Sequence, residues 1–301
     1  MDTTSTLIRI YLFICQRYRG RLAEAAQRQS NNDQPDFTDE EVLKTATASY
    51  VFGLIKKRTT ISEIHKYVED HFSEWFPELP SYQSYNRRLN RLSAVFAPLV
   101  EEALSEVGCE KIRDGRIRIA DSMPIMLAKG QRASQAMVAS DRLASVGYCS
   151  SKDTFYHGVK LHLVVERRSE ELPVPERAGL TPGSENDLRA LRRVLPFIED
   201  GVLCGDKAYC DGPLKERLAE DQNLDLLTPV KREKGQKTLP AADKLFSEAV
   251  SRLRQPIESL FNWINEKTGI QRASKVRSYQ GLLVHAFGRL AAAMLLLALN
   301  P

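Results

Sequence analysis

The chain has 301 residues, of which 43% are hydrophobic and 27% are charged. A chain of this length and composition can bury a sizeable core in one large domain or two unequal ones, which excludes a wholly disordered protein. The formal net charge of +4 is mildly basic and is compatible with a nucleic-acid partner without requiring one. The five cysteines have no zinc-finger spacing, so we expect reduced thiols in a cytosolic protein.

Residues 5–106 have a helical pattern. Thr38 is followed by three acids, as is typical of an N-cap with a negatively charged first turn. Thr60 and Glu63 have the spacing of a capping box, which predicts a second helix. Ser81 follows two prolines and is expected to cap a third helix.

The third helix is basic. It carries Arg87, Arg88 and Arg91, of which Arg87 and Arg91 are i, i+4 neighbours, while its leucines lie on another side. Short helices in succession with a basic last member resemble a helix-turn-helix layout. We therefore expect residues 1–110 to form an all-α, helix-turn-helix-like DNA-binding domain whose three arginines contact DNA. A helical bundle with a solvated basic face is the alternative.

The pattern changes after residue 110, where segments with the period of a strand alternate with segments with the period of a helix. Strands are expected over 116–121, 155–166, 174–180, 201–206 and 225–230, and helices over 184–195 (capped by Ser184), 213–220, 247–266 and 279–299. This order predicts an α/β sheet with flanking helices over residues 111–301. The apolar segment 281–299 contains His285 and Arg289, so we expect a buried helix and no membrane span.

Two of the expected strands end on an acid, Asp121 and Asp206. Strand ends in α/β sheets face a crevice, and carboxylates brought close together there repel unless a cation lies between them. Glu258 on a later helix, four residues after Arg254, could complete a two-metal site. The spacing alone leaves a turn or cap role for the aspartates open, and a surface ion pair for Arg254 and Glu258.

Five segments between about residues 110 and 265 resemble, in order, insertion-sequence transposases of the DDE type. They are IADSMPI at 119–125, FYHGVKLHLVV at 155–165, LTPGSENDLRAL at 180–191, CGDKAY at 204–209 and RQPIESLFNWI at 254–264. The resemblance implies an RNase H-like mixed sheet as the catalytic domain. It also implies that the GDKAY block carries the second aspartate of the site.

The resemblance assigns Asp121, Asp206 and Glu258 as catalytic residues and metal ligands. Arg254 matches the family's arginine, but Ser251 stands where many relatives have a tyrosine, and Lys267 matches a family lysine only approximately. Pro256 disfavours a continuous helix, so we expect it to begin a new helical segment with Glu258 in the first turn.

The activity implied is metal-dependent cleavage and strand transfer at insertion-sequence ends, with two Mg²⁺ ions as cofactor and Mn²⁺ as a substitute. The implied partners are terminal inverted repeats, target DNA and a second copy of the chain, in the bacterial cytoplasm at the nucleoid. A metal-dependent nuclease that does not join, and a catalytically inactive DNA-binding descendant of a transposase, are the alternatives.

Further basic residues are candidates for DNA contacts. Lys207, Arg254 and Lys267 could stabilise phosphates near the acids. Lys152 and Lys160, together with Tyr148, could line the DNA path by phosphate contacts and base stacking. An ordinary solvated surface position is the alternative for each of them.

Overall fold

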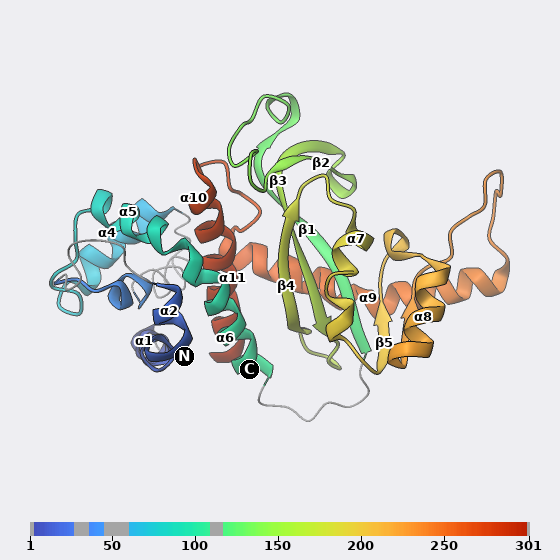
Figure 1. The fold of residues 1–301 in the computed structure, drawn as a ribbon, viewed down its shortest axis with the longest axis horizontal. Coiled ribbons are helices and arrows are strands. Elements are labelled where there is room, and N and C mark those ends of the chain that lie inside the picture. The colour runs from blue at the N-terminus through green and yellow to red at the C-terminus, as the bar shows by residue number, and fades with distance from the viewer. Residues whose placement is uncertain (1–2, 27–35, 45–59, 109–116, 300–301) are drawn as a thin grey trace. The chain divides into compact units, whose positions relative to one another are not determined.

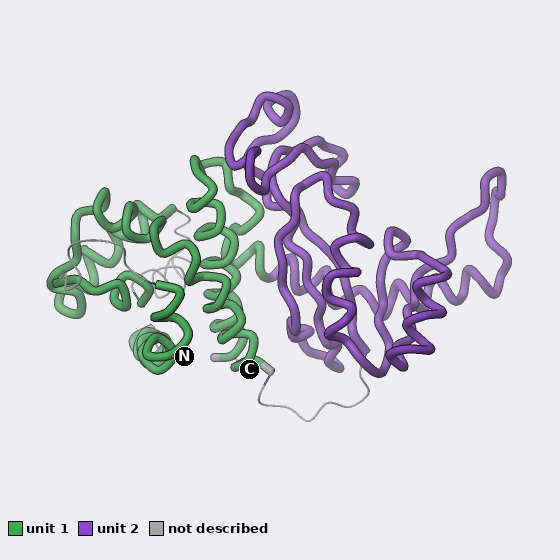
Figure 2. The backbone as a smooth tube through the Cα atoms, viewed as in Figure 1, with its two compact units in different colours: residues 1–110, 264–301 green, residues 111–263 purple. Residues whose placement is uncertain are grey.

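The computed structural model describes residues 3–26, 36–44, 60–108 and 117–299. The chain divides into two compact units (Figure 2): a helical unit of residues 1–110 and 264–301, and a sheet unit of residues 111–263. That residues 1–110 form a DNA-binding domain stays a prediction. Residues 264–301, which we expected with the sheet, belong to the helical unit, where the last helix packs against α6.

The helical unit is built from short helices and irregular helical turns (Figure 1). They are α1 (Thr3–Arg17), a π-helical turn (Tyr18–Leu22), α2 (Ala23–Ala25), α4 (Ile61–Phe72), α5 (Tyr82–Arg91), a 3₁₀ turn (Leu92–Val95), α6 (Phe96–Gly108), α10 (Tyr279–Leu283), a second π-helical turn (Val284–Gly288) and α11 (Arg289–Leu299). Residues 39–44 are also helical.

Local capping explains where several of these helices begin. The capping box predicted before α4 is confirmed, because the Thr60 hydroxyl accepts the Glu63 N–H and the Glu63 carboxylate accepts the Thr60 N–H. Thr38 and Glu41 make the same reciprocal pair before residues 39–44. Ser81 occupies the N-cap position of α5, but its side chain makes no capping hydrogen bond with a described residue.

The C-terminal helices form the core of the helical unit. Leu290, Met294 and Leu295 of α11 are almost fully buried. Tyr279–Ala298 is, among the described helices, the one long and apolar enough to cross a membrane, yet 72% of its most apolar window is buried inside the protein. The expected buried terminal helix is therefore confirmed.

The described residues of the sheet unit form six strands and three α-helices, the last of which, α9, continues into the helical unit (Figure 1). They are β1 (Ile117–Lys129), β2 (Ser145–Cys149), β3 (Thr154–Glu166), β4 (Val174–Pro182), α7 (Asp187–Leu191), β5 (Gly201–Cys204), α8 (Gly212–Gln222), β6 (Leu224–Leu227) and α9 (Ala241–Thr268). The strand order is β2-β3-β1-β5-β6, with β4 also paired to β3. The sheet is mixed, as expected, because β1, β5 and β6 run parallel while the other pairs are antiparallel.

Helices flank this sheet on both faces, with α7 and α8 in front of it and α9 behind it in Figure 1. The front layer buries Leu191 of α7 together with Leu214 and Leu218 of α8, in one cluster with Ala120 and Leu203 of the sheet. Such leucine burial is the main source of stability in a layered α/β unit. This burial also holds the front helices against β1, which carries Asp121, and against β5, which ends two residues before Asp206.

Several sequence expectations for this unit were wrong. Strand β1 does not end at residue 121 but continues to Lys129. Helix α9 runs unbroken through Pro256, so no new helical segment begins there. Helix α7 is capped by Asn186, whose side chain accepts the Arg189 N–H, and not by Ser184. The β2 hairpin was not expected at all.

Candidate active site

Asp121 lies within β1 at the point where its neighbour β5 stops. Strand β5 pairs with β1 only from Ile117 to Ile119, and the rest of β1 pairs only with β3 among the described strands. Asp121 is therefore the second residue past the shared segment, on a rim of the sheet. Pro124 fits this edge of β1, because proline is tolerated where a strand needs no further ladder hydrogen bond.

Asp206 reaches the same rim from β5. The strand ends at Cys204, which pairs with Ile119, so both aspartates lie two residues beyond one register position of neighbouring parallel strands. The Asp206 carboxylate accepts the Ala208 N–H at 2.7 Å and opens a 3₁₀ turn, Lys207–Tyr209. This local bond fixes the orientation of the carboxyl group.

The GDKAY block has a steric reason for its glycine. A Cβ on residue 205 would lie 2.8–2.9 Å from atoms of the Tyr209 side chain, which is closer than packed atoms can approach. Tyr209 is almost fully buried in the core between the sheet and its front helices. Gly205 therefore lets the turn fold back over the ring, and this geometry sets the position of Asp206.

Asp206 is close enough to Asp121 to affect its charge state. The pKa of Asp121 is raised to about 6, chiefly by burial and in smaller part by the negative charge of Asp206, although Arg254 and the Ser122 N–H lower it. Burial and a neighbouring negative charge both disfavour the ionised form of a carboxyl group, and a nearby cation stabilises that form. The pair is thus two hard oxygen donors that repel each other, which is the kind of donor set that divalent cations such as Mg²⁺ bind.

Arg254 supplies the cation next to Asp121 in this structure. Its guanidinium, from the middle of α9, donates to the Asp121 carboxylate at 2.9 Å, and the two side chains are only 13% and 20% exposed. The Arg254 Nε is also buried and has no hydrogen-bond partner among the described residues. This nitrogen is therefore a donor that an additional acceptor could use.

Glu258 lies one turn beyond Arg254 on α9 and is exposed. Within the described part of the chain, no three His, Cys, Asp or Glu side chains form a group that could hold a metal ion. The structure thus brings together two of the three predicted acids and does not bring Glu258 into that pair. The two aspartates fit a divalent cation, and Glu258 as the third ligand stays a prediction.

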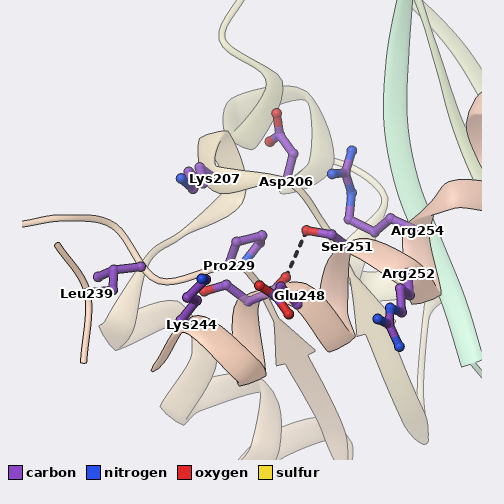
Figure 3. Close-up of a pocket in the computed structure, with 10 residues that line it drawn as sticks. Asp206, Lys207, Pro229, Leu239, Lys244, Glu248, Ser251, Arg252 and Arg254 are labelled. Atoms are coloured by element: carbon purple, nitrogen blue, oxygen red, sulfur yellow. Dashed lines mark hydrogen bonds between the residues drawn. The ribbon is translucent and has the colours of Figure 1, made fainter. Parts of the chain in front are cut away.

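A pocket of about 590 Å³ opens beside Asp206 (Figure 3). Asp206 and Lys207 line one side of it, and α9 lines the other with Lys244, Ser247, Glu248, Ser251 and Arg254. In Figure 3 the Arg254 side chain extends from α9 toward the side of the pocket that bears Asp206. Cationic side chains on both walls suit a ligand with phosphate groups.

Residues 112–295, more than half of the chain, match the family model described as "Transposase DDE domain". The chain belongs to this transposase family. DDE transposases act on DNA and generally use divalent metal ions, in agreement with the paired aspartates. No curated protein and no solved structure matches the chain in the corresponding comparisons.

In a DDE transposase, basic residues outside the acidic site are expected to contact DNA, and the structure gives two of the predicted ones other partners. Arg88 is mostly buried and pairs with Asp39 at 2.8 Å. Lys160 is 17% exposed and donates to Asp187 at 3.0 Å and to the Glu185 carbonyl at 2.9 Å. Both cations are held inside the fold, which argues against a free phosphate-binding role for either of them.

The other predicted DNA contacts of the transposase remain predictions. Arg87 and Arg91 are exposed on α5, Lys152 is exposed in the turn before β3, Lys207 is exposed at the pocket, and Lys267 is exposed near the end of α9 in the helical unit. Tyr148 is half-exposed and contacts the ring of Phe155 across the β2–β3 hairpin.

Sequence reasoning missed two groups of this transposase's residues. The first is the α9 wall of the pocket, Lys244, Ser247 and Ser251, whose spacing of three and four residues along one helix face was a usable signal. The second is Ser122, which joins Asp121 to Asp187. No sequence pattern could have indicated that contact, because 65 residues separate its two ends.

Proposed function

We propose that this transposase cuts DNA at the ends of an insertion sequence and joins the freed 3′-hydroxyl to target DNA, using an RNase H-like fold for the sheet unit. The observation that supports this most directly is the approach of Asp121 and Asp206 at one rim of the sheet, with Arg254 beside them. A mixed sheet flanked by helices is the architecture that such a fold requires.

In this proposal Asp121, Asp206 and Glu258 hold two Mg²⁺ ions, for which Mn²⁺ can substitute. Bound divalent ions would stabilise the attacking and leaving oxygens of the scissile phosphate and lower the pKa of water. Glu258 lies on the same side of α9 as Arg254, since residues four apart in a helix are neighbours, so its exposed side chain can turn toward the aspartates.

Arg254 has two tasks in this site. It compensates the charge of Asp121 before the metal ions bind, because its guanidinium is the charged partner of that carboxylate. Its Nε–H, which has no partner within the described ranges, can then donate to a phosphate oxygen of bound DNA. Arginine suits both tasks, because its planar guanidinium presents several donors in a fixed geometry.

The pocket beside Asp206 is proposed to receive the DNA strand that carries the scissile phosphate. Lys207 and Lys244 lie on opposite walls and can neutralise successive phosphates, which makes the affinity depend on salt. Exposed Arg87 and Arg91 of the helical unit are proposed to bind the terminal repeats. Because transposition joins two element ends, we propose a homodimer on DNA, in the bacterial cytoplasm at the nucleoid.

The test uses the purified full chain and labelled DNA that carries both ends of its own element. The proposal expects nicks at the element ends and joined products in Mg²⁺ or Mn²⁺, and neither product in EDTA. Nicks without joined products would support the nuclease alternative. Binding of the ends without nicking in either metal would support the inactive DNA-binding alternative and overturn the proposal.

A further inference from the structure

Asp187, the first residue of α7, is the centre of a polar cluster that the proposed reaction does not use. Its Oδ1 accepts the Ser122 hydroxyl at 3.1 Å and the Lys160 ammonium at 3.0 Å. Lys160 also donates to the Glu185 carbonyl at 2.9 Å, so the ion pair is fixed to the loop before α7. The Asp187 side chain is only 23% exposed, so the cluster is not an ordinary solvated group of surface charges.

Ser122 connects this cluster to Asp121 directly. Adjacent residues of a strand point to opposite faces, so Ser122 points toward α7 while Asp121 points toward α9. The backbone N–H of Ser122 donates to the Asp121 carboxylate at 2.8 Å, and its hydroxyl donates to Asp187. One residue therefore links the carboxylate on one face of the sheet to the partly buried ion pair on the other.

The second acid-bearing segment also packs against α7. The turn Lys207–Tyr209, which follows Asp206, contacts this helix, and Tyr209 lies in one hydrophobic cluster with Leu191 of α7. Burial raises the pKa of the Tyr209 phenol, and among the carboxylates that add to this effect Asp187 acts more strongly than Asp121 or Asp206. The beginning of α7 is thus in contact with both segments that carry the aspartates.

We propose that Asp187 is a positioning residue, which holds β1 at Asp121 through the Ser122 hydroxyl and holds the Asp206 turn through the packing of α7 on Tyr209. Rigid support of this kind matters because metal ligands must keep their geometry while carrying repelling charges. Asp187 does not touch the metal ions or the DNA. This inference rests on the proposed function, since it concerns the same two carboxylates.

The test measures metal binding separately from catalysis. Mn²⁺ binding to the full chain is followed by the loss of the free-ion electron paramagnetic resonance signal. Nicking in Mg²⁺ and the metal-free thermal midpoint are measured beside it. Asp187→Asn is expected to weaken Mn²⁺ affinity about 10- to 100-fold, as loss of a group that supports metal ligands commonly does. Ser122→Ala is expected to weaken it in the same direction by a smaller factor.

Two further variants complete the design. Ser122→Thr keeps the hydroxyl and is compatible with a strand, so it should restore Mn²⁺ affinity to near the wild-type value. Asp225→Asn removes an exposed acid of β6 and should leave Mn²⁺ affinity unchanged. If Asp187→Asn fails to fold, the comparison of Ser122→Ala with Ser122→Thr still tests the proposal.

The outcomes distinguish a failure of the positioning role of Asp187 from a failure of the proposed function. Wild-type Mn²⁺ affinity in both Asp187→Asn and Ser122→Ala, even with a lowered metal-free thermal midpoint, would overturn the positioning role and leave the proposed function intact. A wild-type chain that neither binds Mn²⁺ nor nicks DNA would overturn the proposed function, and the positioning role with it.

Discussion

The Arg254 guanidinium on α9 lies 2.9 Å from the Asp121 carboxylate on β1, although 133 residues separate them in the chain. This ion pair joins the helix behind the sheet to the strand that carries the first aspartate. Glu258 lies one turn further along α9, and its approach to the same rim stays a prediction.

We expect the Arg254–Asp121 ion pair to contribute to the free energy of unfolding. Arg254→Gln removes a charged hydrogen bond and leaves Asp121 without its counter-charge, so the free energy of unfolding at pH 7.5 should fall by about 1–3 kcal/mol. At pH 5 the loss should be smaller, because Asp121 then takes up a proton. Denaturant unfolding at both pH values measures this.

The matched control for that experiment is Arg217→Gln, which removes an exposed arginine of α8. Its effect should stay within about 0.5 kcal/mol at either pH. An equal loss of stability for Arg254→Gln at both pH values would show that the pair with ionised Asp121 is not what this arginine stabilises.

Asp121 itself should make the stability of the metal-free chain depend on pH. Burial raises its pKa to about 6 from 3.8, so the folded chain holds this proton more tightly than the unfolded chain does. The resulting stabilisation is complete below the unfolded pKa and is lost as the pH rises through about 6. It amounts to up to about 3 kcal/mol.

Comparison with Asp121→Asn isolates this contribution. Between about pH 4 and pH 7 the unfolding free energy of the wild-type chain should decrease relative to that of the variant, which has no carboxyl group at residue 121. Chemical denaturation in EDTA across that range gives both curves. Parallel curves would mean that residue 121 titrates as it does in the unfolded chain.

The close contact between Gly205 and Tyr209 predicts the effect of a single methyl group. Gly205→Ala puts a Cβ 2.8–2.9 Å from the Tyr209 side chain, so it should destabilise the chain by about 1–3 kcal/mol. It should also lower nicking, because the displaced turn carries Asp206. In Gly212→Ala the new Cβ has nothing within 4 Å, and thermal unfolding of this control should match wild type.

The three arginines of α5 should separate into two classes. Arg87→Ala and Arg91→Ala should weaken binding of the terminal repeats and lower the salt slope by about one unit for each lost phosphate contact. Arg88→Ala should instead lower stability, because it removes the ion pair that Arg88 makes with Asp39 in a mostly buried position. Repeat binding titrated at several salt concentrations, beside thermal unfolding, distinguishes these effects.

The features that were predictable from the sequence depend on local pattern. The Thr60–Glu63 capping box and strand β3 follow from spacing within a few residues, and the structure has both. The aspartates were recognisable because each stands in a short apolar strand segment that resembles the family. Their approach required only that β1 and β5 be neighbours, which they are.

The features that were missed depend on contacts between distant residues. Strand β1 continues past Asp121 because β3 pairs with it as far as Lys129, and no local signal near residue 121 indicates that partner. Strand β2 exposes Val146 and Tyr148, so its pattern lacks the buried apolar face by which strands are recognised. The Arg254–Asp121 pair likewise depends on how α9 crosses the sheet.

The central claim, that Asp121, Asp206 and Glu258 carry the chemistry, is tested most directly by near-isosteric variants of the three acids. Asp121→Asn, Asp206→Asn and Glu258→Gln are compared with wild type for nicking and strand transfer on terminal-repeat DNA in Mg²⁺, and for DNA binding in EDTA. Each variant should lose cleavage by several orders of magnitude, on the order of 10³-fold or more, because metal-held charge stabilisation fails. DNA binding in EDTA should persist or tighten slightly, since a negative charge near the phosphates has gone.

Normal cleavage by either aspartate variant would contradict the account. Normal cleavage by Glu258→Gln alone would show that another acid, with Glu248 of the pocket as the first to test, is the third ligand.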